Sequence, residues 1–401
     1  MKEIPAVFVY AGSRIYQNVI KKHFNEICRL KQPLPYSLAA GFTKGVLFYE
    51  YVGYNISGLD TVHEIINQNL ADTNLFLIID DSYEGLASYA ELKKLKTLID
   101  ANRKNISDWM FISSNAGLKK LMQDVFGSAN NFLYYNIHLK LDRYDNIDCD
   151  LLDHNINNKL RSKKFLCVNR HERLHRLKTI DFIIKKDILK DSYASCMLGI
   201  SDAILDESIQ ADPNDFVPGY YDDNLGSNCL EEETKQRLKT YLPIELDVKE
   251  ARNKILKANM PSLEKYFDDS YLSIVTEGDF SAKEGKRQFT EKVVKCFAFH
   301  HPFIVVGLPN TLELLQEEGF LTFSEIIDES YDSIEDDDLR LSAALQEVER
   351  LSKMNIHELK ACYEQVIPVL EHNYNLYKKK IETASPSLLI NRIMKWYSYN
   401  H

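Results

Sequence analysis

The stretch "NLFLIID" at residues 74–80 decides the fold class of this chain. It is an apolar run without polar alternation, as expected of a strand that is covered on both faces. The helix-like stretch "ELKKLKTLIDA" at 91–101 follows it, and the plan repeats as "WMFISS" at 109–114 and "AGLKKLMQDVF" at 116–126. Strands separated by single helices predict a parallel sheet with helices on both faces.

The alternation starts again in the second half of the chain, with "KFLCVN" at 164–169 and "YLSIVTE" at 271–277 as strands. The polar stretch at 142–164 separates the two halves and is typical of an interdomain linker. No G-x-G-x-x-G pattern is present, so no dinucleotide cofactor is expected. We predict an α/β protein with two doubly wound, Rossmann-like domains, at residues 1–150 and 151–340, and C-terminal helices at 341–401 that pack back on them.

Composition narrows the function classes. Among the 401 residues, 45% are hydrophobic and 27% charged, which is typical of a soluble globular protein. The formal net charge of -10 argues against a broad nucleic-acid surface. The 7 cysteines include no C-x-x-C pair, which favours a reducing compartment and argues against structural zinc. With no membrane-length apolar run and no signal-peptide pattern at the start, we expect a cytoplasmic protein.

The triplet Thr290-Glu291-Lys292 opens a helix-like stretch that is mostly apolar, followed by the strand-like "PFIVVG" at 302–307. In open α/β sheets, ligands bind beyond the carboxyl ends of strands, where helix N-termini favour anions. Lys292 could meet a phosphate there, and Glu291 could accept hydrogen bonds from sugar hydroxyls. The alternative is an ordinary amphipathic helix with Thr290 as its N-cap, and composition alone favours that alternative.

A second stretch, "KFLCVNRHERLHR" at 164–176, runs from a strand into a basic turn and then a helix. Basic residues at a helix start oppose the helix dipole, and a bound anion would remove that conflict. The alternative is a solvated basic helix start.

Together these motifs resemble the donor-binding half of GT-B-type nucleotide-sugar glycosyltransferases, closest to the α-1,3-fucosyltransferases and phage-encoded relatives. The similarity covers roughly residues 160–325 and follows the family's order: a strand, an Asn and an Arg, a strand ending in Glu, then Thr-Glu-Lys. It implies that Arg176 and Lys292 bind the donor diphosphate and Glu291 the ribose. Asn169, Arg173, Glu277 and Thr290 complete the implied donor site. The chain departs from the pattern at Gln288, where the family often has an aromatic residue, in its longer loop before the triplet, and by one position at Arg176.

An inverting sugar transfer needs a base for the acceptor hydroxyl, supplied by the domain that faces the donor. Asp80, Asp81 and Glu84 follow the strand at 74–80, and Asp81 is the first choice; a solvated loop carboxylate is the alternative for each. Ser13 and Arg14, in the turn "YAGSR", are candidate acceptor contacts, with a structural turn as the alternative.

Two further patterns suggest metal chemistry. Asp148-Cys149-Asp150 resembles the D-x-D motif of metal-dependent glycosyltransferases, but it lies in the expected linker. His300-His301 is better explained as a helix end, because adjacent side chains diverge around a helix. We therefore expect no metal site. The C-terminal stretch "LLINRIMKWYSYNH" at 388–401 could lie on a membrane surface, although folding back on the first domain is favoured.

These observations predict a metal-independent glycosyltransferase that moves a sugar from a nucleotide-diphosphate sugar to a hydroxyl of a glycan or similar acceptor. No cofactor is expected beyond the donor substrate. One alternative is a phage-type DNA glycosyltransferase acting on hydroxymethylated bases, which the acidic charge disfavours. The other is a non-catalytic module that binds a nucleotide or a protein.

Overall fold

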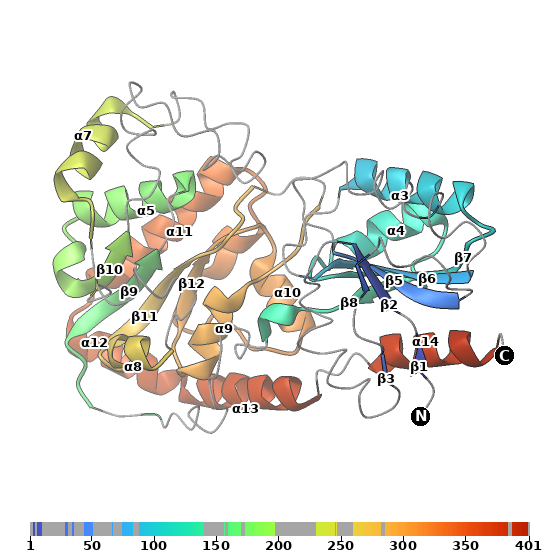
Figure 1. The fold of residues 1–401 in the computed structure, drawn as a ribbon. Helices are drawn as coiled ribbons and strands as arrows, with labels where there is room; N and C mark the ends of the chain where they lie inside the picture. The colour runs from blue at the N-terminus through green and yellow to red at the C-terminus, as the bar shows by residue number, and fades with distance from the viewer. Residues whose placement is uncertain are drawn as a thin grey trace. The chain divides into compact units, whose positions relative to one another are not determined.

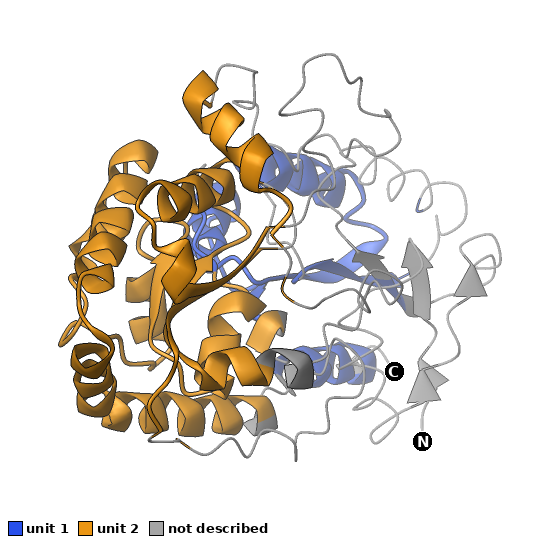
Figure 2. Ribbon diagram, turned by 90° about the vertical axis from the view of Figure 1, so that its left-hand side faces the viewer, with its two compact units in different colours: residues 1–137, 283–288, 382–401 blue, residues 138–282, 289–381 orange. Residues whose placement is uncertain are grey.

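A computed structural model of the protein describes most of the chain beyond residue 73 and short segments before it. The described residues are 3–4, 6–9, 29–30, 34–35, 44–50, 66, 74–82, 88–139, 156, 159–169, 173–196, 230–244, 246, 260–281, 285–383 and 387–399. Two compact units divide the chain (Figure 2). Unit 1 comprises residues 1–137, 283–288 and 382–401, and unit 2 comprises residues 138–282 and 289–381. The helices at 341–381, expected as a separate segment, therefore belong to unit 2.

The described part of unit 1 holds a 6-stranded, fully parallel sheet in the order β4-β2-β5-β6-β7-β8. Its strands are β2 (Ala6–Val9), β4 (Leu34–Pro35), β5 (Lys44–Glu50), β6 (Asn74–Asp81), β7 (Ile106–Ser113) and β8 (Phe132–Tyr134). A separate parallel pair is formed by β1 (Glu3–Ile4) and β3 (Arg29–Leu30). The helices are α3 (Tyr89–Ala101), α4 (Leu118–Phe126) and α14 (Ser387–Tyr399).

Helices cover both faces of this sheet, as the unbroken apolar run at 74–80 predicts (Figure 1). Alternate residues of β6 point to opposite faces: Leu77 packs in the core under α3 and α4, whereas Phe76 packs in the core under α14. On that second face Phe76 meets Trp396 of α14 edge to face, with ring centroids 5.6 Å apart. The aromatic side of the C-terminal helix is thus part of the core of unit 1.

The described part of unit 2 holds a 4-stranded parallel sheet in the order β10-β9-β11-β12. The strands are β9 (Lys163–Asn169), β10 (Ser192–Cys196), β11 (Ser270–Thr276) and β12 (Phe303–Val306). Its helices are α5 (Leu174–Lys185), α7 (Glu232–Tyr241), α8 (Met260–Asp268), α9 (Glu291–Ala298), α10 (Thr311–Glu317), α11 (Asp337–Ser352), α12 (Ile356–Gln365) and most of α13 (Ile367–Thr383), with 3-10 turns η3 (Ile137–Leu139, from the unit boundary), η6 (Leu189–Asp191) and η8 (Glu329–Ser333). Figure 1 shows α5 and α11 on one side of this sheet and α9 and α12 on the other.

Parallel sheets with helices on both faces confirm the α/β class in both units. In unit 2 the chain passes from β9 outward to β10 and then returns to the other side of β9 with β11. The order of strands therefore reverses between β9 and β11. Helices that follow the strands on either side of such a point leave a crevice at the carboxyl ends, which is where open α/β sheets bind ligands.

Candidate functional site

The carboxyl ends of β9 and β11 bring together the residues that the sequence marks as a donor site. Asn169 is the last residue of β9, and Glu277 directly follows β11. The two neighbouring strand ends are joined through side chains, because the Thr276 hydroxyl donates a hydrogen bond to the Asn169 amide oxygen. Asn169 is buried, so its observed role is to hold the two strand ends together.

Glu277 holds the start of α9 in place. Its carboxylate accepts hydrogen bonds from the Gly278 amide (3.1 Å), the Thr290 amide (2.9 Å) and the Thr290 hydroxyl. The side chain is only 2% exposed. Gly307, at the end of β12, lies close behind it: a Cβ atom there would sit 3.1 Å from the Glu277 Cβ. In this structure Glu277 contacts backbone amides and Thr290, and so holds the N-terminus of α9 against the end of β11.

The first turn of α9 presents the charged pair of the triplet. Thr290 is the N-cap residue, with extended backbone and a side chain that accepts from the Lys292 amide. Lys292 Nζ donates to Thr290 Oγ1 (3.1 Å) and to Glu291 Oε1 (3.0 Å). The second carboxylate oxygen of Glu291 lies 3.5 Å from Nδ1 of His138, which comes from η3. The Thr290 cap and the Glu291–Lys292 pair are therefore both present at the N-terminus of α9.

The groups around Glu291 favour its ionised form. Burial alone would raise the pKa of Glu291, but Lys292, His138 and Lys295 together hold that pKa well below its usual value. Burial also lowers the pKa of Lys295, with Glu291 acting in the opposite direction. The side chain of Lys292 is 28% exposed, against 15% for Glu291 and 7% for His138.

The start of α5 contacts the end of β11. Arg173 is the N-cap residue of α5 and pairs with Asp279 at 3.4 Å. Arg176 is buried, and its Nη2 donates to the Glu277 carbonyl oxygen at 2.9 Å. His175 Nε2 donates to the same carbonyl at 3.0 Å. Burial, and after it the charge of Arg176, holds the pKa of His175 well below its usual value, so His175 is neutral.

A buried arginine from α11 organises the loop after Glu277. Arg340 donates to the carbonyl oxygens of Phe280 (2.6 Å) and Gly307 (3.1 Å), so it ties this loop to the end of β12. Its guanidinium lies 4.6 Å from the centroid of the Phe280 ring, which also stacks on His175 at 5.0 Å. These contacts fix the loop that follows β11.

The carboxylates expected to act as the catalytic base are buried inside unit 1. Asp81 is 0% exposed and accepts a hydrogen bond from the Ser113 hydroxyl at 2.8 Å. Asp80 is also buried and accepts from the Ser82 amide and hydroxyl at 3.1 and 2.6 Å. Neither side chain reaches the surface, so this arrangement does not favour either as a base. Glu84, Ser13 and Arg14 lie outside the described residues.

The loop before the triplet makes its contacts with the turn between β7 and α4, inside unit 1. The Ala116 amide donates to the Arg287 carbonyl (2.9 Å), and the Arg287 amide donates to Asn115 Oδ1 (3.0 Å). Gln288, which stands where an aromatic residue was expected, donates to the Ser114 hydroxyl at 2.6 Å. A Cβ atom at Gly117 would lie 2.1 Å from the Gly285 carbonyl oxygen, so only glycine allows this approach.

The two patterns that suggested metal chemistry have different outcomes. Asp148-Cys149-Asp150 lies outside the described residues. His301 is fully buried in the core of unit 2, where Nδ1 meets the Ser273 hydroxyl at 2.7 Å and Nε2 donates to the Ser270 carbonyl at 2.6 Å. Among the described residues, no group of three or more His, Cys, Asp or Glu side chains is placed to hold a metal ion. None of the described helices is long and apolar enough to span a membrane.

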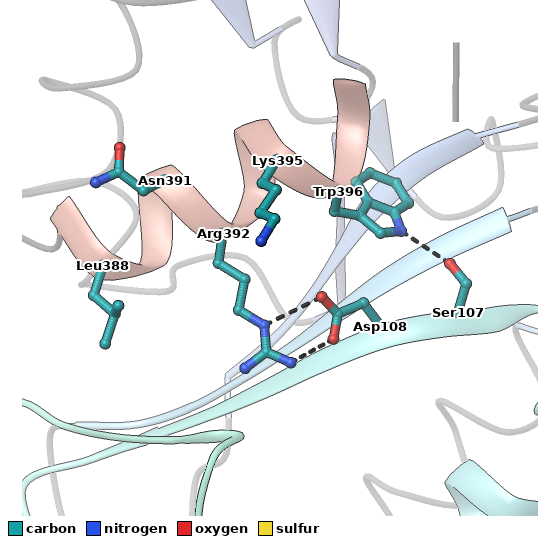
Figure 3. Close-up of a pocket in the computed structure, with 7 residues that line it drawn as sticks. All are labelled: Ser107, Asp108, Leu388, Asn391, Arg392, Lys395 and Trp396. Atoms are coloured by element: carbon teal, nitrogen blue, oxygen red, sulfur yellow. Dashed lines mark hydrogen bonds and ion pairs between the residues drawn. The ribbon is translucent and has the colours of Figure 1, made fainter. Parts of the chain in front are cut away.

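A pocket of about 520 Å³ lies elsewhere in unit 1, between α14 and the start of β7 (Figure 3). Arg392 Nη2 and Nε donate to both carboxylate oxygens of Asp108, at 2.6 and 3.2 Å. Trp396 Nε1 donates to Ser107 at 2.9 Å. These bonds fasten α14 to the amino end of β7, the sheet edge opposite to that used for ligands in α/β proteins. The pocket therefore lies at the packing interface between α14 and the sheet.

Comparison with known proteins assigns no family to the chain. No family model matches the chain, and no curated protein matches it.

Sequence reasoning missed His138 and Arg340, and it placed His175 in the basic turn without the contact that His175 makes with the Glu277 carbonyl. The sequence predicts a strand over "NFLYYNIHLKL" at 131–141, which includes His138, whereas the strand ends at Tyr134 and His138 lies in the turn η3. Arg340 and His175 act through backbone carbonyls, and a sequence pattern does not identify such contacts.

Proposed function

We propose that unit 2 binds the diphosphate of a nucleotide sugar at the crevice between β9 and β11, and that the protein is a metal-independent glycosyltransferase. The observation that carries the proposal is the first turn of α9, where Lys292 and a helix N-terminus lie at the point of strand-order reversal. Helix N-termini and lysine ammonium groups are both suited to phosphate oxygens. The crevice is also flanked by the start of α5, which carries Arg173.

In the proposed reaction, an acceptor hydroxyl attacks the anomeric carbon of the donor sugar while the bond to the diphosphate breaks. Negative charge grows on the leaving diphosphate, and preorganised cations stabilise it in a site sheltered from water. Lys292 supplies the accessible charge. Arg176 does not contact the diphosphate in this proposal: it is buried, holds the Glu277 carbonyl and adds positive potential. Arg173, at the start of α5, is the second cation near the site. The ribose contact of Glu291 stays a prediction, since its carboxylate oxygens face Lys292 and His138 in this structure.

The test is a binding screen with UDP-glucose, GDP-mannose, GDP-fucose and CDP-glucose, read as a shift in melting temperature and then by titration calorimetry. We expect at least one to stabilise the protein. Lys292→Met should weaken its binding by about 1.5–3 kcal/mol, the scale of hydrogen bonds to charged groups. Lys353→Met is the matched control, because Lys353 is 73% exposed at the end of α11.

Indifference of the wild-type protein to every sugar nucleotide would overturn the proposal. Equal binding by wild type and Lys292→Met would place the diphosphate elsewhere. Stabilisation without turnover on any acceptor, water included, would favour the non-catalytic binding module.

A further inference from the structure

The two central strands of the unit 2 sheet part before they end. The backbone pairing of β9 with β11 extends to the pair Leu166 and Ser273, although both strands continue, to Asn169 and Thr276. Over these last residues β9 stays paired with β10, and β11 stays paired with β12. The Thr276 hydroxyl, bonded to the Asn169 amide oxygen, links the two strand ends. The sheet therefore divides into two strand pairs at its carboxyl end, where its strand order also reverses.

Val168 lies at this division and is only partly covered by the chain. It is 39% exposed, whereas its neighbours across the sheet, Ser195 on β10 and Val275 on β11, are 3% and 6% exposed. Ser195 pairs directly with Val168, and Val275 stands beside it when the register of β9 and β11 is continued. A central strand of a parallel sheet normally has helices over both faces. An exposed valine in β9 therefore marks a part of the sheet face that the described helices leave uncovered.

Val168 faces the side of the sheet on which α9 begins. Side chains two residues apart in a strand share a face, so Val275 and Glu277 point to that same side. Glu277 accepts from the Thr290 amide at 2.9 Å, and Thr290 is the N-cap residue of α9. From the spacing of strands and residues in a sheet, the Cα atoms of Val168 and Glu277 are about 8 Å apart. Lys292 Nζ bonds to Thr290 Oγ1 at 3.1 Å, and the Lys292 side chain is 28% exposed. An apolar side chain and an ammonium group, both partly exposed, are thus close enough for one ligand to contact both.

We propose that Val168 contacts the nucleobase of the donor while Lys292 meets its diphosphate; this inference rests on the function proposed above. A sugar nucleotide carries a flat base with an apolar face at one end, whereas its sugar is covered with hydroxyl groups. The base suits an aliphatic surface better than the sugar does, because burial of hydroxyl groups without partners is unfavourable. The negative charge of the diphosphate is complementary to Lys292. Small-molecule sites commonly combine apolar contact with a few placed polar groups in this way.

The experiment measures Kd by titration calorimetry for three probes: the sugar nucleotide that binds best in the four-member panel, its nucleoside diphosphate, and inorganic pyrophosphate. Val168→Ala and Val168→Thr should weaken the two nucleotides about 3- to 10-fold, the scale expected when one or two methyl groups lose part of their contact. Pyrophosphate has no base, so its Kd should not change in either variant. Lys292→Met should weaken all three probes. Pyrophosphate is measured by competition against the nucleoside diphosphate, so that weak binding is still resolved.

The two variants at Val168 separate contact from folding. Threonine keeps the branched shape of valine and replaces one methyl group by a hydroxyl, so it tests apolar contact without a change of size. Because Val168 is exposed, the melting temperature of both ligand-free variants should match that of wild type. Leu321→Ala is the matched control: Leu321 follows α10 and is 44% exposed, and its replacement should change the binding of none of the probes.

The outcomes distinguish this inference from the proposed function. If wild type binds no sugar nucleotide, both fail. If Lys292→Met weakens binding but both Val168 variants bind like wild type, the diphosphate site stands and the nucleobase assignment is wrong. An equal loss for pyrophosphate would show that Val168 acts through the fold of the strand end. A loss confined to the sugar nucleotide would place the sugar, and not the base, on Val168, and either of these last two results would overturn the inference.

Discussion

Replacement of Glu277 by glutamine tests the support under the candidate site without any ligand. The Glu277 carboxylate is buried and accepts three hydrogen bonds, from the Gly278 amide, the Thr290 amide and the Thr290 hydroxyl. Glutamine keeps the shape but has one acceptor oxygen and an NH₂ group. Whichever way the amide turns, its NH₂ faces a group that donates to Glu277 now. At least one partly buried donor therefore loses its partner.

The expected loss is about 2–3 kcal/mol in the free energy of unfolding. A hydrogen bond to a charged acceptor contributes about 1.5–3 kcal/mol, and a buried donor without a partner costs about 1–3 kcal/mol. The neutral amide offsets part of this loss, because burial of a carboxylate is itself unfavourable. The N-cap hydroxyl of Thr290 contributes about 1 kcal/mol of its own. Because Glu277 and Thr290 are in contact, their effects should not add in a double-mutant cycle with Thr290→Val.

Urea unfolding followed by far-UV circular dichroism is the suitable assay, because both tryptophans, Trp109 and Trp396, belong to unit 1 and report on that unit. Glu371→Gln is the control, since Glu371 is exposed on α13. A loss below about 0.5 kcal/mol, the range of ordinary surface substitutions, would mean that Glu277 does not hold the start of α9. Additive effects of Glu277→Gln and Thr290→Val would also refute the reasoning.

Three further predictions concern other parts of the protein. Gly117→Ala should destabilise unit 1 by about 1–3 kcal/mol and speed tryptic cleavage after Arg287, because the new Cβ would lie 2.1 Å from the Gly285 carbonyl oxygen. Gly278→Ala is the control: the nearest atom to its new Cβ is 3.9 Å away, so stability and cleavage should both stay unchanged. Burial raises the pKa of Asp332 from 3.8 to about 6, so the folded state holds this proton more tightly than the unfolded state. The free energy of unfolding should therefore fall as pH rises from 3.8 to about 6. Asp332→Asn should flatten that slope in pH-dependent melting, and an unchanged slope would contradict the assignment. Donor binding and turnover should survive EDTA, because in the proposed site Lys292 and a helix N-terminus, and no metal ion, neutralise the diphosphate. Loss in chelator with recovery in manganese would direct attention to Asp148 and Asp150.

Strand positions were the most predictable part of the fold. The run at 74–80 and the strand-like 164–169 agree with β6 (Asn74–Asp81) and β9 (Lys163–Asn169) to within a residue. The reason is physical: a strand covered on both faces has an apolar side chain at nearly every position, and no solvated segment shares that pattern. The N-cap at Thr290 was predictable for a similar reason, since its hydrogen bond is local.

The direction in which a carboxylate points was not predictable. Asp81 and Glu277 both stand at the end of a buried strand, and both were interpreted as site residues. In the structure Asp81 accepts from Ser113 on the neighbouring strand, and Glu277 accepts from Thr290 at the start of the next helix. Such partners are set by the pairing of strands and the docking of a helix, which are tertiary events. The proximity of His138 to Glu291 is set in the same way.

The Thr-Glu-Lys triplet was open to two interpretations, an ordinary capped helix or a phosphate site. The structure contains the cap, and a phosphate site at this helix end would depend on that cap. Thr290 can cap α9 and at the same time donate to Glu277 because its extended backbone aims the hydroxyl at both. That double contact fixes where the first turn of α9, with Glu291 and Lys292, begins relative to the end of β11. A lysine placed by a flexible loop would lose side-chain entropy on each binding event, whereas Lys292 already bonds to Thr290 and Glu291. In the proposed function the cap is part of the diphosphate site, so loss of the Thr290 hydroxyl should weaken both the helix and the binding of a sugar nucleotide.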